Sequence, residues 1–275
     1  MTPTAAIDVT AGFAGEALGP VPIDEAANRI RVYCTSRYSG WAVYDLAGIS
    51  ARAAGLFTEV SAWSLLFANA LNGRVEITQL AEFNRALRRE FADRIGSVPA
   101  DQDLHSMTEE EVETVIRACQ FKFNGAWAPR ITKLGALYRP AAIPVLDGYV
   151  GMAFGYQRDD LSITVQRFGL NRQQRIAAIV RALATYLHDH HETMAQLRAL
   201  VSPTVPELAA APGPQQPPLI PDLRLLDIVI WTAMDDRIAT RAGKSPKWLG
   251  RPVGAHIPSE AIAPEPIYPA GINPR

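Results

Sequence analysis

Two ionisable residues in the middle of the chain, Lys133 and Asp147, could do chemistry together. A carboxylate that is held in a dry pocket stabilises a cation that forms during a reaction. A lysine whose pKa is lowered by burial, or by a neighbouring cation such as Arg130, can attack an electrophilic carbon. Structural roles compete with both functions, because Asp147 could cap a helix and the stem of Lys133 could cover apolar surface.

Local sequence signals place these two residues on successive helices. Asn124-Gly125 is typical of a turn, and Pro129 suits the first turn of a helix that would end before Pro140. The apolar connector around Pro144 then leads to Asp147, where a carboxylate can accept the free amides of a following helix. The segment therefore predicts a helix, an extended connector, an acidic residue and a second helix.

Segment 127–150 resembles the core of the helix–hairpin–helix DNA glycosylases, in which a lysine-bearing helix leads into a Pro-Val-Asp connector. The resemblance implies that Lys133 attacks a sugar anomeric carbon as a Schiff-base nucleophile and that Asp147 supports the oxocarbenium charge. Trp127-Ala128-Pro129 replaces the glycine-rich hairpin whose amides bind a DNA phosphate in those enzymes. The spacing from lysine to aspartate is also shorter, and Arg130 competes with Lys133 for the position of the nucleophile.

The chain is still more similar to a bacterial helical family of unknown function, over most of residues 38–237. The stretches that carry this similarity are Thr132-Lys133-Leu134, Arg139-Pro140, Ile143-Pro144, Asp147, Leu223-Arg224, Leu226-Asp227-Ile228, Trp231 and the helix ending in Asn69-Ala70-Leu71-Asn72. Such a resemblance implies a shared fold, and a shared fold does not carry an activity with it.

Aromatic rings and arginines near the Lys133–Asp147 pair could form a substrate pocket, since rings stack on bases and arginines bind phosphates. The residues that we expect to bind substrate are Trp127, Arg130, Tyr138 and Arg139. Trp41, Tyr44 and Trp63 could stack on a flipped base in the same way, or they could lie in the hydrophobic core.

The densest group of potential metal ligands is His188-Asp-His190-His191-Glu192. His188, His191 and Glu192 would be neighbours on one helix, but the pattern is not HExxH and adjacent histidines point apart. We expect a solvated helix face here and no metal site, with metal binding as the alternative. P-loop, GxSxG, GxGxxG and CxxC motifs are absent from the sequence, and we expect no cofactor.

Helical periodicity dominates the sequence, which predicts an all-α fold with a glycosylase-like core. The helices that we expect outside the central segment are 25–35 capped by Asp24, 61–71, 78–94 capped by Thr78, one behind the Thr108–Glu111 capping box, 171–197 and 223–237. Strand signals are confined to 74–77 and 162–166. In the last helix, Asp227 is expected to form a buried ion pair with Arg224.

A single helical domain is expected over residues 22–241, between a flexible leader (1–21) and a proline-rich tail (242–275). Residues 202–221 contain seven prolines and predict an extended strap within the domain. The tail could bind a protein partner.

Composition argues for a cytoplasmic protein without a membrane span. The chain lacks a long apolar run and a signal-peptide pattern, and its two cysteines, Cys34 and Cys119, fit buried thiols. The net charge of −1 shows no overall basic excess, so nucleic-acid binding would require a local basic face. The sequence therefore leaves two functions open: a glycosylase-like enzyme, or a non-catalytic module that binds nucleic acid or protein.

Overall fold

A computed structural model of the 275-residue chain describes residues 5–13, 16–36, 39–71, 73–100, 102–162, 166, 169–209 and 219–246. These residues are mainly helical, as the periodicity predicted, and the two short strands pair antiparallel with each other. The elements are β1 (Ala6–Ile7), β2 (Val21–Pro22), α1 (Ile23–Thr35), the π-helix η1 (Trp41–Leu46), α2 (Ala47–Ala53), α3 (Ser64–Phe67), the 3₁₀ helix η2 (Ala68–Leu71), α4 (Ile77–Glu82), α5 (Arg85–Gly96), η3 (Leu104–Ser106), α6 (Glu109–Cys119), α7 (Ala128–Tyr138), α8 (Gly148–Ala153), α9 (Arg172–Asp189), α10 (His191–Val201), η4 (Pro206–Leu208) and α11 (Asp222–Arg241).

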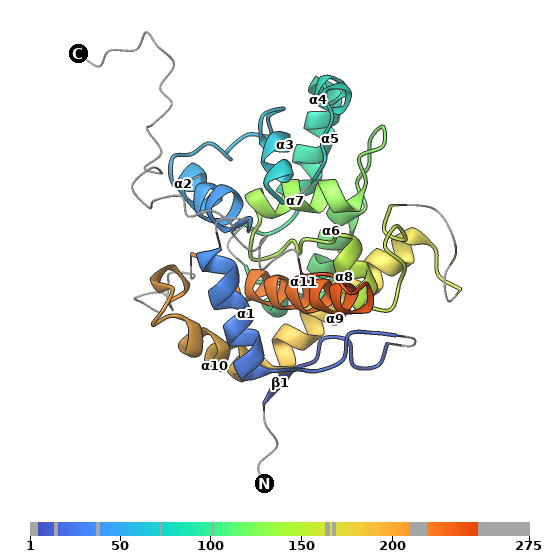
Figure 1. Ribbon diagram of the computed structural model, residues 1–275. Coiled ribbons are helices and arrows are strands. Elements are labelled where there is room, and N and C mark those ends of the chain that lie inside the picture. The colour runs from blue at the N-terminus through green and yellow to red at the C-terminus, as the bar shows by residue number, and fades with distance from the viewer. Residues whose placement is uncertain are drawn as a thin grey trace, which may run out of the picture.

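Helix α11 lies across the middle of the molecule and packs against α1, α8 and α9 (Figure 1). Its sequence is apolar on nearly every side, and Leu225, Leu226 and Val229 are completely buried, as expected for a central helix. Helix α6 packs against α5, α7 and α9, so the upper and lower helices of Figure 1 share one continuous hydrophobic core.

Side-chain caps fix the starts of the helices that hold the central segment in place. Thr108 and Glu111 form the predicted capping box, and Asn171 forms a second box with Gln174 at the start of α9. Asp147 caps α8, as predicted. These short-range hydrogen bonds are visible in the sequence because donor and acceptor lie within three residues of each other.

Each of three predicted helices is divided in two in the structure. Segment 61–71 forms α3 and η2, 78–94 forms α4 and α5, and 171–197 forms α9 and α10. Asn84 accepts two backbone amides and starts α5, while His190 has a non-helical backbone between α9 and α10. At Asn84 local capping therefore overrides the apolar periodicity, whereas no side-chain cap hydrogen bond starts α10 at His190.

The start of the chain also differs from the expectation of a flexible leader. Within its described residues, Ala6–Ile7 pairs with Val21–Pro22, and Ile7 and Val9 are buried. Helix α1 begins at Ile23 with Pro22 as its N-cap, so Asp24 lies in the first turn and is not the cap.

Several predictions concern segments that the structure describes only in part. Segment 74–77 is not a strand, because it runs into α4, and residues 163–165 of the other predicted strand lie outside the described residues. The described part of the proline-rich strap contains η4, whereas 210–218 lie outside. Residues 247–275 of the tail also lie outside, and its expected protein partner stays a prediction.

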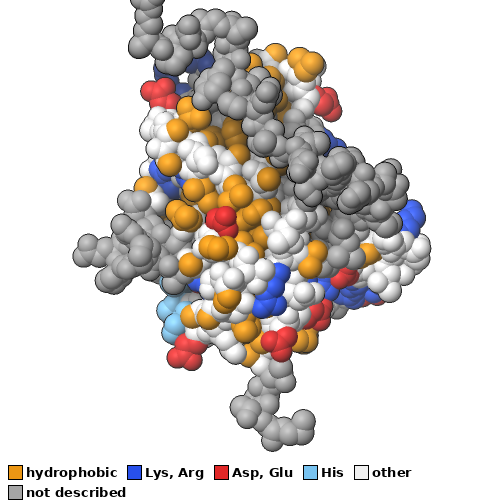
Figure 2. Space-filling model, turned by 60° about the vertical axis from the view of Figure 1, so that its left-hand side comes forward, with side chains coloured by type: hydrophobic (Ala, Val, Ile, Leu, Met, Phe, Trp, Pro, Cys, Tyr) orange, Lys and Arg blue, Asp and Glu red, His pale blue; other side chains and the backbone are white. Residues whose placement is uncertain are grey.

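The surface is mixed in character. Figure 2 shows hydrophobic and uncharged side chains across the middle of one face, with charged side chains mostly toward its margins. Among the described residues, no helix is both long and apolar enough to cross a membrane. Both cysteines, Cys34 and Cys119, are free thiols.

The close approach of α8 to the loop that follows it predicts a stability difference between two glycines. A Cβ at Gly148 would lie 2.6 Å from the Arg158 carbonyl oxygen, whereas one at Gly96 meets no atom within 4 Å. We expect Gly148→Ala to lower the free energy of unfolding by about 1–3 kcal/mol. The control Gly96→Ala should be neutral or gain up to about 1 kcal/mol of helix propensity. Chemical denaturation measures both, and equal stabilities of the two variants would contradict the packing.

Candidate functional site

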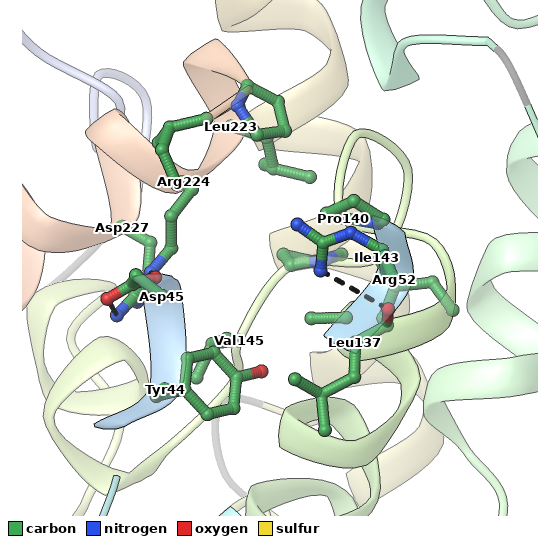
Figure 3. A pocket seen from close by; sticks show the side chains of 14 residues that line it. Tyr44, Asp45, Arg52, Leu137, Pro140, Ile143, Val145, Leu223, Arg224 and Asp227 are labelled. Carbon is green, nitrogen blue, oxygen red and sulfur yellow. Dashed lines mark hydrogen bonds and ion pairs between the residues drawn. The ribbon is translucent and has the colours of Figure 1, made fainter. Parts of the chain in front are cut away.

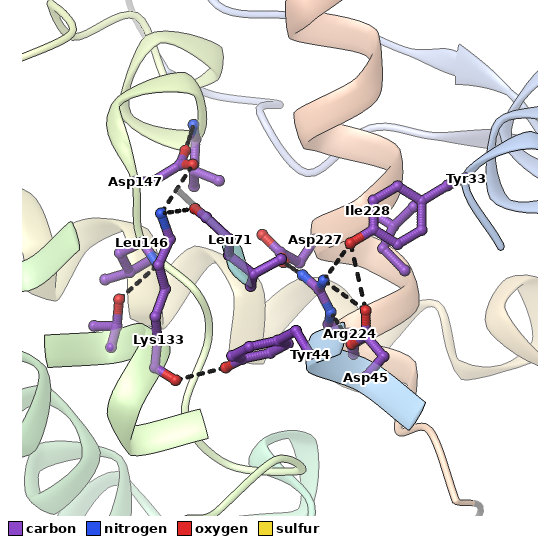
Figure 4. A network of polar contacts seen from close by, with 12 residues as sticks. Tyr33, Tyr44, Asp45, Leu71, Lys133, Leu146, Asp147, Arg224, Asp227 and Ile228 are labelled. Carbon is purple, nitrogen blue, oxygen red and sulfur yellow. Dashed lines mark hydrogen bonds and ion pairs between the residues drawn. The ribbon is translucent and has the colours of Figure 1, made fainter. Parts of the chain in front are cut away.

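The fold brings Lys133 and Asp147 together. Lys133 Nζ lies 3.7 Å from Asp147 Oδ2 and donates a hydrogen bond of 2.6 Å to the Leu71 carbonyl (Figure 4). Thr132 fixes this arrangement, because its hydroxyl donates to the Ala128 carbonyl and accepts the Leu146 amide from the connector. Helix α7 is thereby tied to the strand-like segment that delivers Asp147.

Asp147 uses its two carboxylate oxygens for different purposes. Oδ1 accepts the amides of Tyr149 and Val150 at 2.9 and 3.1 Å, which caps α8. Oδ2 faces the Lys133 ammonium instead. The capping interpretation is therefore confirmed, and it leaves one oxygen for a second role.

Lys133 is buried, which contradicts the expectation of a surface lysine covering apolar area. Its residue exposure is 3 %, and its ammonium contacts Asp147 and the Leu71 carbonyl at the end of η2. Burial lowers the pKa of the Lys133 ammonium, and the adjacent Asp147 and Asp227 carboxylates oppose this shift. The sequence could not show this burial, because Leu71 is 62 residues away.

Beside this pair, the Arg224 guanidinium is buried among acceptors from three helices. Its Nε donates to Asp45 Oδ1 at 2.7 Å, and its Nη2 donates to Asp45 Oδ2 and to the Tyr33 hydroxyl. Its Nη1 pairs with Asp227, which confirms the ion pair predicted within α11. The guanidinium also lies over the rings of Tyr33 and Tyr44.

Asp227 is the most perturbed carboxyl group of the site. Burial raises its pKa to about 7, and the negative charges of Asp147 and Asp45 act in the same direction. The Arg224 cation opposes the shift without cancelling it, because that cation is shared with Asp45. A carboxyl group with such a pKa can hold a proton near neutral pH and release it there.

A cavity of about 60 Å³ opens between these groups. Its polar walls come from Lys133, Asp147, Asp227 and Arg224, and its apolar walls include Trp231 and Leu71. A smaller cavity of about 30 Å³ lies on the other side of the Arg224–Asp227 pair, between Tyr44, Val145 and Leu137 (Figure 3). Arg52 donates to the Leu137 carbonyl at 3.4 Å across that second cavity.

Two of the four predicted binding residues lie at the start of α7, outside the lining of the cavity. Arg130 donates to the carbonyls of Gly73 and Gly125, and the cations of Lys122 and Arg172 both lie over the ring of Trp127. Both residues line a cleft of about 320 Å³ that also contains Arg74, Arg158 and Gly148. This basic cleft is lined by Gly148 and the cavity by Asp147, the residue before it, and the two share no lining residue.

The other two predicted binding residues, Tyr138 and Arg139, are at the opposite end of α7. Tyr138 donates to the Ser64 hydroxyl at 2.8 Å, and Arg139 donates to the Val98 carbonyl. Both line a separate groove and do not contact the cavity. The sequence places them a few residues after Lys133, which is why they were predicted to bind substrate. The length of α7 separates them from the cavity.

The remaining candidate residues are distributed between core and surface. Trp41 and Tyr44 are buried, and the Tyr44 hydroxyl donates to the Lys133 carbonyl at 2.6 Å, whereas Trp63 is exposed. His188 and His191 lie on separate helices, α9 and α10. In the described part of the chain, no group of three or more histidine, cysteine or acidic side chains could hold a metal ion.

Asp45 and Tyr33 are site residues that the sequence interpretation missed. The available signal was a single acidic residue in the apolar stretch Trp41–Leu46, since a buried carboxylate needs a partner. Asp227 was interpreted only as structural, because nothing local shows that it also lines a cavity beside Asp147.

Comparison with known families shows to which family this chain belongs. A model described as "Family of unknown function (DUF6308)" matches residues 26–234. The chain belongs to this family. The match runs from α1 into α11 and includes Lys133, Asp147, Arg224 and Asp227. Neither a curated protein nor a solved structure matches the chain significantly.

The raised pKa of Asp227 predicts how stability depends on pH. The folded state holds this proton up to about pH 7, whereas the unfolded chain releases it near pH 4. The protonated Asp227 carboxyl therefore adds to the free energy of unfolding at low pH. This contribution is lost as pH rises toward 7, by at most about 1.4 kcal/mol per pH unit. Thermal unfolding from pH 5 to 8 should show this loss in the wild type and not in Asp227→Asn.

Asp222→Asn is the matched control, because it removes a carboxylate that pairs with Arg198 at the start of the same helix. This control should keep the pH trend of the wild type. Parallel stability curves of wild type and Asp227→Asn between pH 5 and 8 would contradict the assignment of the proton to Asp227.

Proposed function

We propose that the protein cleaves the N-glycosidic bond of a nucleotide unit, using a helical core of the glycosylase type. The observation that carries the proposal is the geometry of Asp147. One of its oxygens is fixed by the α8 amides, and the other faces a cavity beside a second carboxyl group, Asp227, whose pKa is about 7. Enzymes that hydrolyse glycosidic bonds commonly use two carboxyl groups in unlike environments, one as general acid and one as base or nucleophile.

Asp227 would act as the general acid. Its proton passes to the nitrogen of the departing base as the bond between that nitrogen and the sugar carbon breaks. Asp147 would support the positive charge that forms on the sugar and then accept a proton from the attacking water. The water oxygen bonds to the sugar carbon, so the products are a free base and a sugar with a hydroxyl group.

Lys133 supports this reaction as a positioning residue. Its ammonium is held between Asp147 and the Leu71 carbonyl, which orients the free oxygen of Asp147 toward the cavity. The alternative role, Schiff-base nucleophile, requires Lys133 to lose its proton and to leave the Leu71 carbonyl. The lowered pKa of Lys133 favours the first of these two steps.

The size of the cavity limits which part of a substrate enters it. Its volume of about 60 Å³ is well below the roughly 150 Å³ that encloses a benzene ring, so a whole base does not fit. The reacting sugar carbon and its water are small enough. The base would then lie outside the cavity.

The basic cleft around Gly148 supports a phosphorylated substrate. Arg74, Arg130 and Arg158 line it, together with one acidic residue, Asp159. Arginine binds phosphate through paired hydrogen bonds, and the cleft begins one residue beyond Asp147. A nucleotide unit could therefore place its phosphate in the cleft and its sugar at the cavity.

Base release from nucleotides and from single- and double-stranded oligonucleotides tests the proposal. We expect Asp147→Asn and Asp227→Asn each to lower the rate by about a hundredfold to ten-thousandfold. Asp189→Asn, at an exposed carboxylate on α9, is the control and should keep the wild-type rate. Thermal unfolding verifies that each variant is folded at the assay temperature.

The role of Lys133 is tested separately by borohydride trapping on DNA that contains abasic sites. Hydrolysis of the proposed kind gives no covalent adduct, whereas a nucleophilic Lys133 gives an adduct that Lys133→Met abolishes. Such an adduct would show that Lys133 acts as a Schiff-base nucleophile and not as a positioning residue. Absence of base release from every substrate by the folded wild type would sink the enzyme proposal in both forms.

A non-catalytic module that binds nucleic acid is the second candidate. The basic cleft favours it, because phosphate binding by Arg74, Arg130 and Arg158 requires no chemistry at Asp147. Salt-sensitive binding of an oligonucleotide without base release would distinguish this candidate from the enzyme.

A further inference from the structure

A second basic surface lies at the far end of α7 from the basic cleft. It is a groove of about 650 Å³ between helix α5 and the segment 57–63, with Tyr138 and Arg139 at its base. We call it the arginine groove. Helix α7 has 11 residues and is about 16 Å long, so the groove is distinct from the cleft around Trp127.

The arginine groove has an excess of positive charge. Arg85, Arg88 and Arg89 lie on one face of α5, since residues three and four apart are neighbours on a helix. None of the three forms an ion pair with a carboxylate in the described part of the chain. Glu59 is the one acidic residue among those that line the groove.

Trp63 lies in the same groove and exposes 74 % of its surface. An indole exposed to this extent leaves its ring face available for stacking on a flat ligand. Here it stands across the groove from the arginines of α5, in the segment that leads into α3. The groove therefore offers both positive charge and a flat ring.

We propose that the arginine groove binds a single-stranded nucleic acid, with phosphates on the arginines of α5 and a base stacked on Trp63. Arginines alone would also suit an acidic peptide, whose carboxylates they bind equally well. The exposed indole decides between the two, because stacking on an aromatic ring is available to every base. This inference does not depend on chemistry at Asp147.

Fluorescence anisotropy of a labelled oligo-dT of about 16 nucleotides, measured over a range of salt concentrations, tests the inference. We expect the variant R85Q/R88Q/R89Q to bind more weakly. Its slope of log affinity against log salt should fall by about 2, since each lost phosphate contact contributes about 0.7. Trp63→Ala should weaken binding at least about fivefold, and Trp63→Phe should retain most of it.

The control R117Q/R181Q/R241Q removes the same charge from exposed arginines outside the groove and should bind like the wild type. Equal binding by the two triple variants would overturn the inference, as would no binding by the wild type at low salt. Competition by poly-glutamate with no effect of Trp63→Ala would overturn it in favour of an acidic peptide.

Discussion

The buried Arg224 guanidinium is the interaction on which the rest of the site depends. It joins α11 to η1 through Asp45 and to α1 through Tyr33. A buried charge is tolerated only when its donors are satisfied, and removal of one partner from such a pair typically costs about 3–5 kcal/mol. Because Asp45 accepts two of the guanidinium nitrogens, Asp227 receives only part of the compensating charge, and its pKa stays high.

Helix α7 is the second constraint, because it is tied both to the connector that carries Asp147 and to η1, which carries Asp45. Thr132 ties the helix to the connector, and the Tyr44 hydroxyl ties the Lys133 carbonyl to η1, the element that also carries Asp45. Lys133 then reaches both Asp147 and the end of η2. The cavity is the space that remains when these contacts are made, so its shape depends on hydrogen bonds and not on apolar packing alone.

The sequence predicted the parts of this site that short-range hydrogen bonds determine. Asp147 was placed correctly as a cap because its partners are two and three residues away, and the Arg224–Asp227 pair spans three residues. Asp45 could not be found in this way, because 179 residues separate it from Arg224. The burial of Lys133 depends on α11 and η2, which the pattern around Thr132 does not reveal. Periodicity likewise gave the apolar faces of α4 and α5 without the break at Asn84.

Burial and the balance of charge together explain why the pKa of Asp227 is raised. Lys133 and Arg224 supply two positive charges, and Asp45, Asp147 and Asp227 supply three negative ones when all are ionised. Burial makes an uncompensated negative charge costly, so the pKa of Asp227 rises to about 7 and this carboxyl group can take up a proton near neutral pH. If that proton leaves with a base, the cluster gains the same negative charge at the moment when the sugar becomes positive. The arrangement that raises the pKa of Asp227 in the resting protein would then stabilise the cation of the proposed reaction.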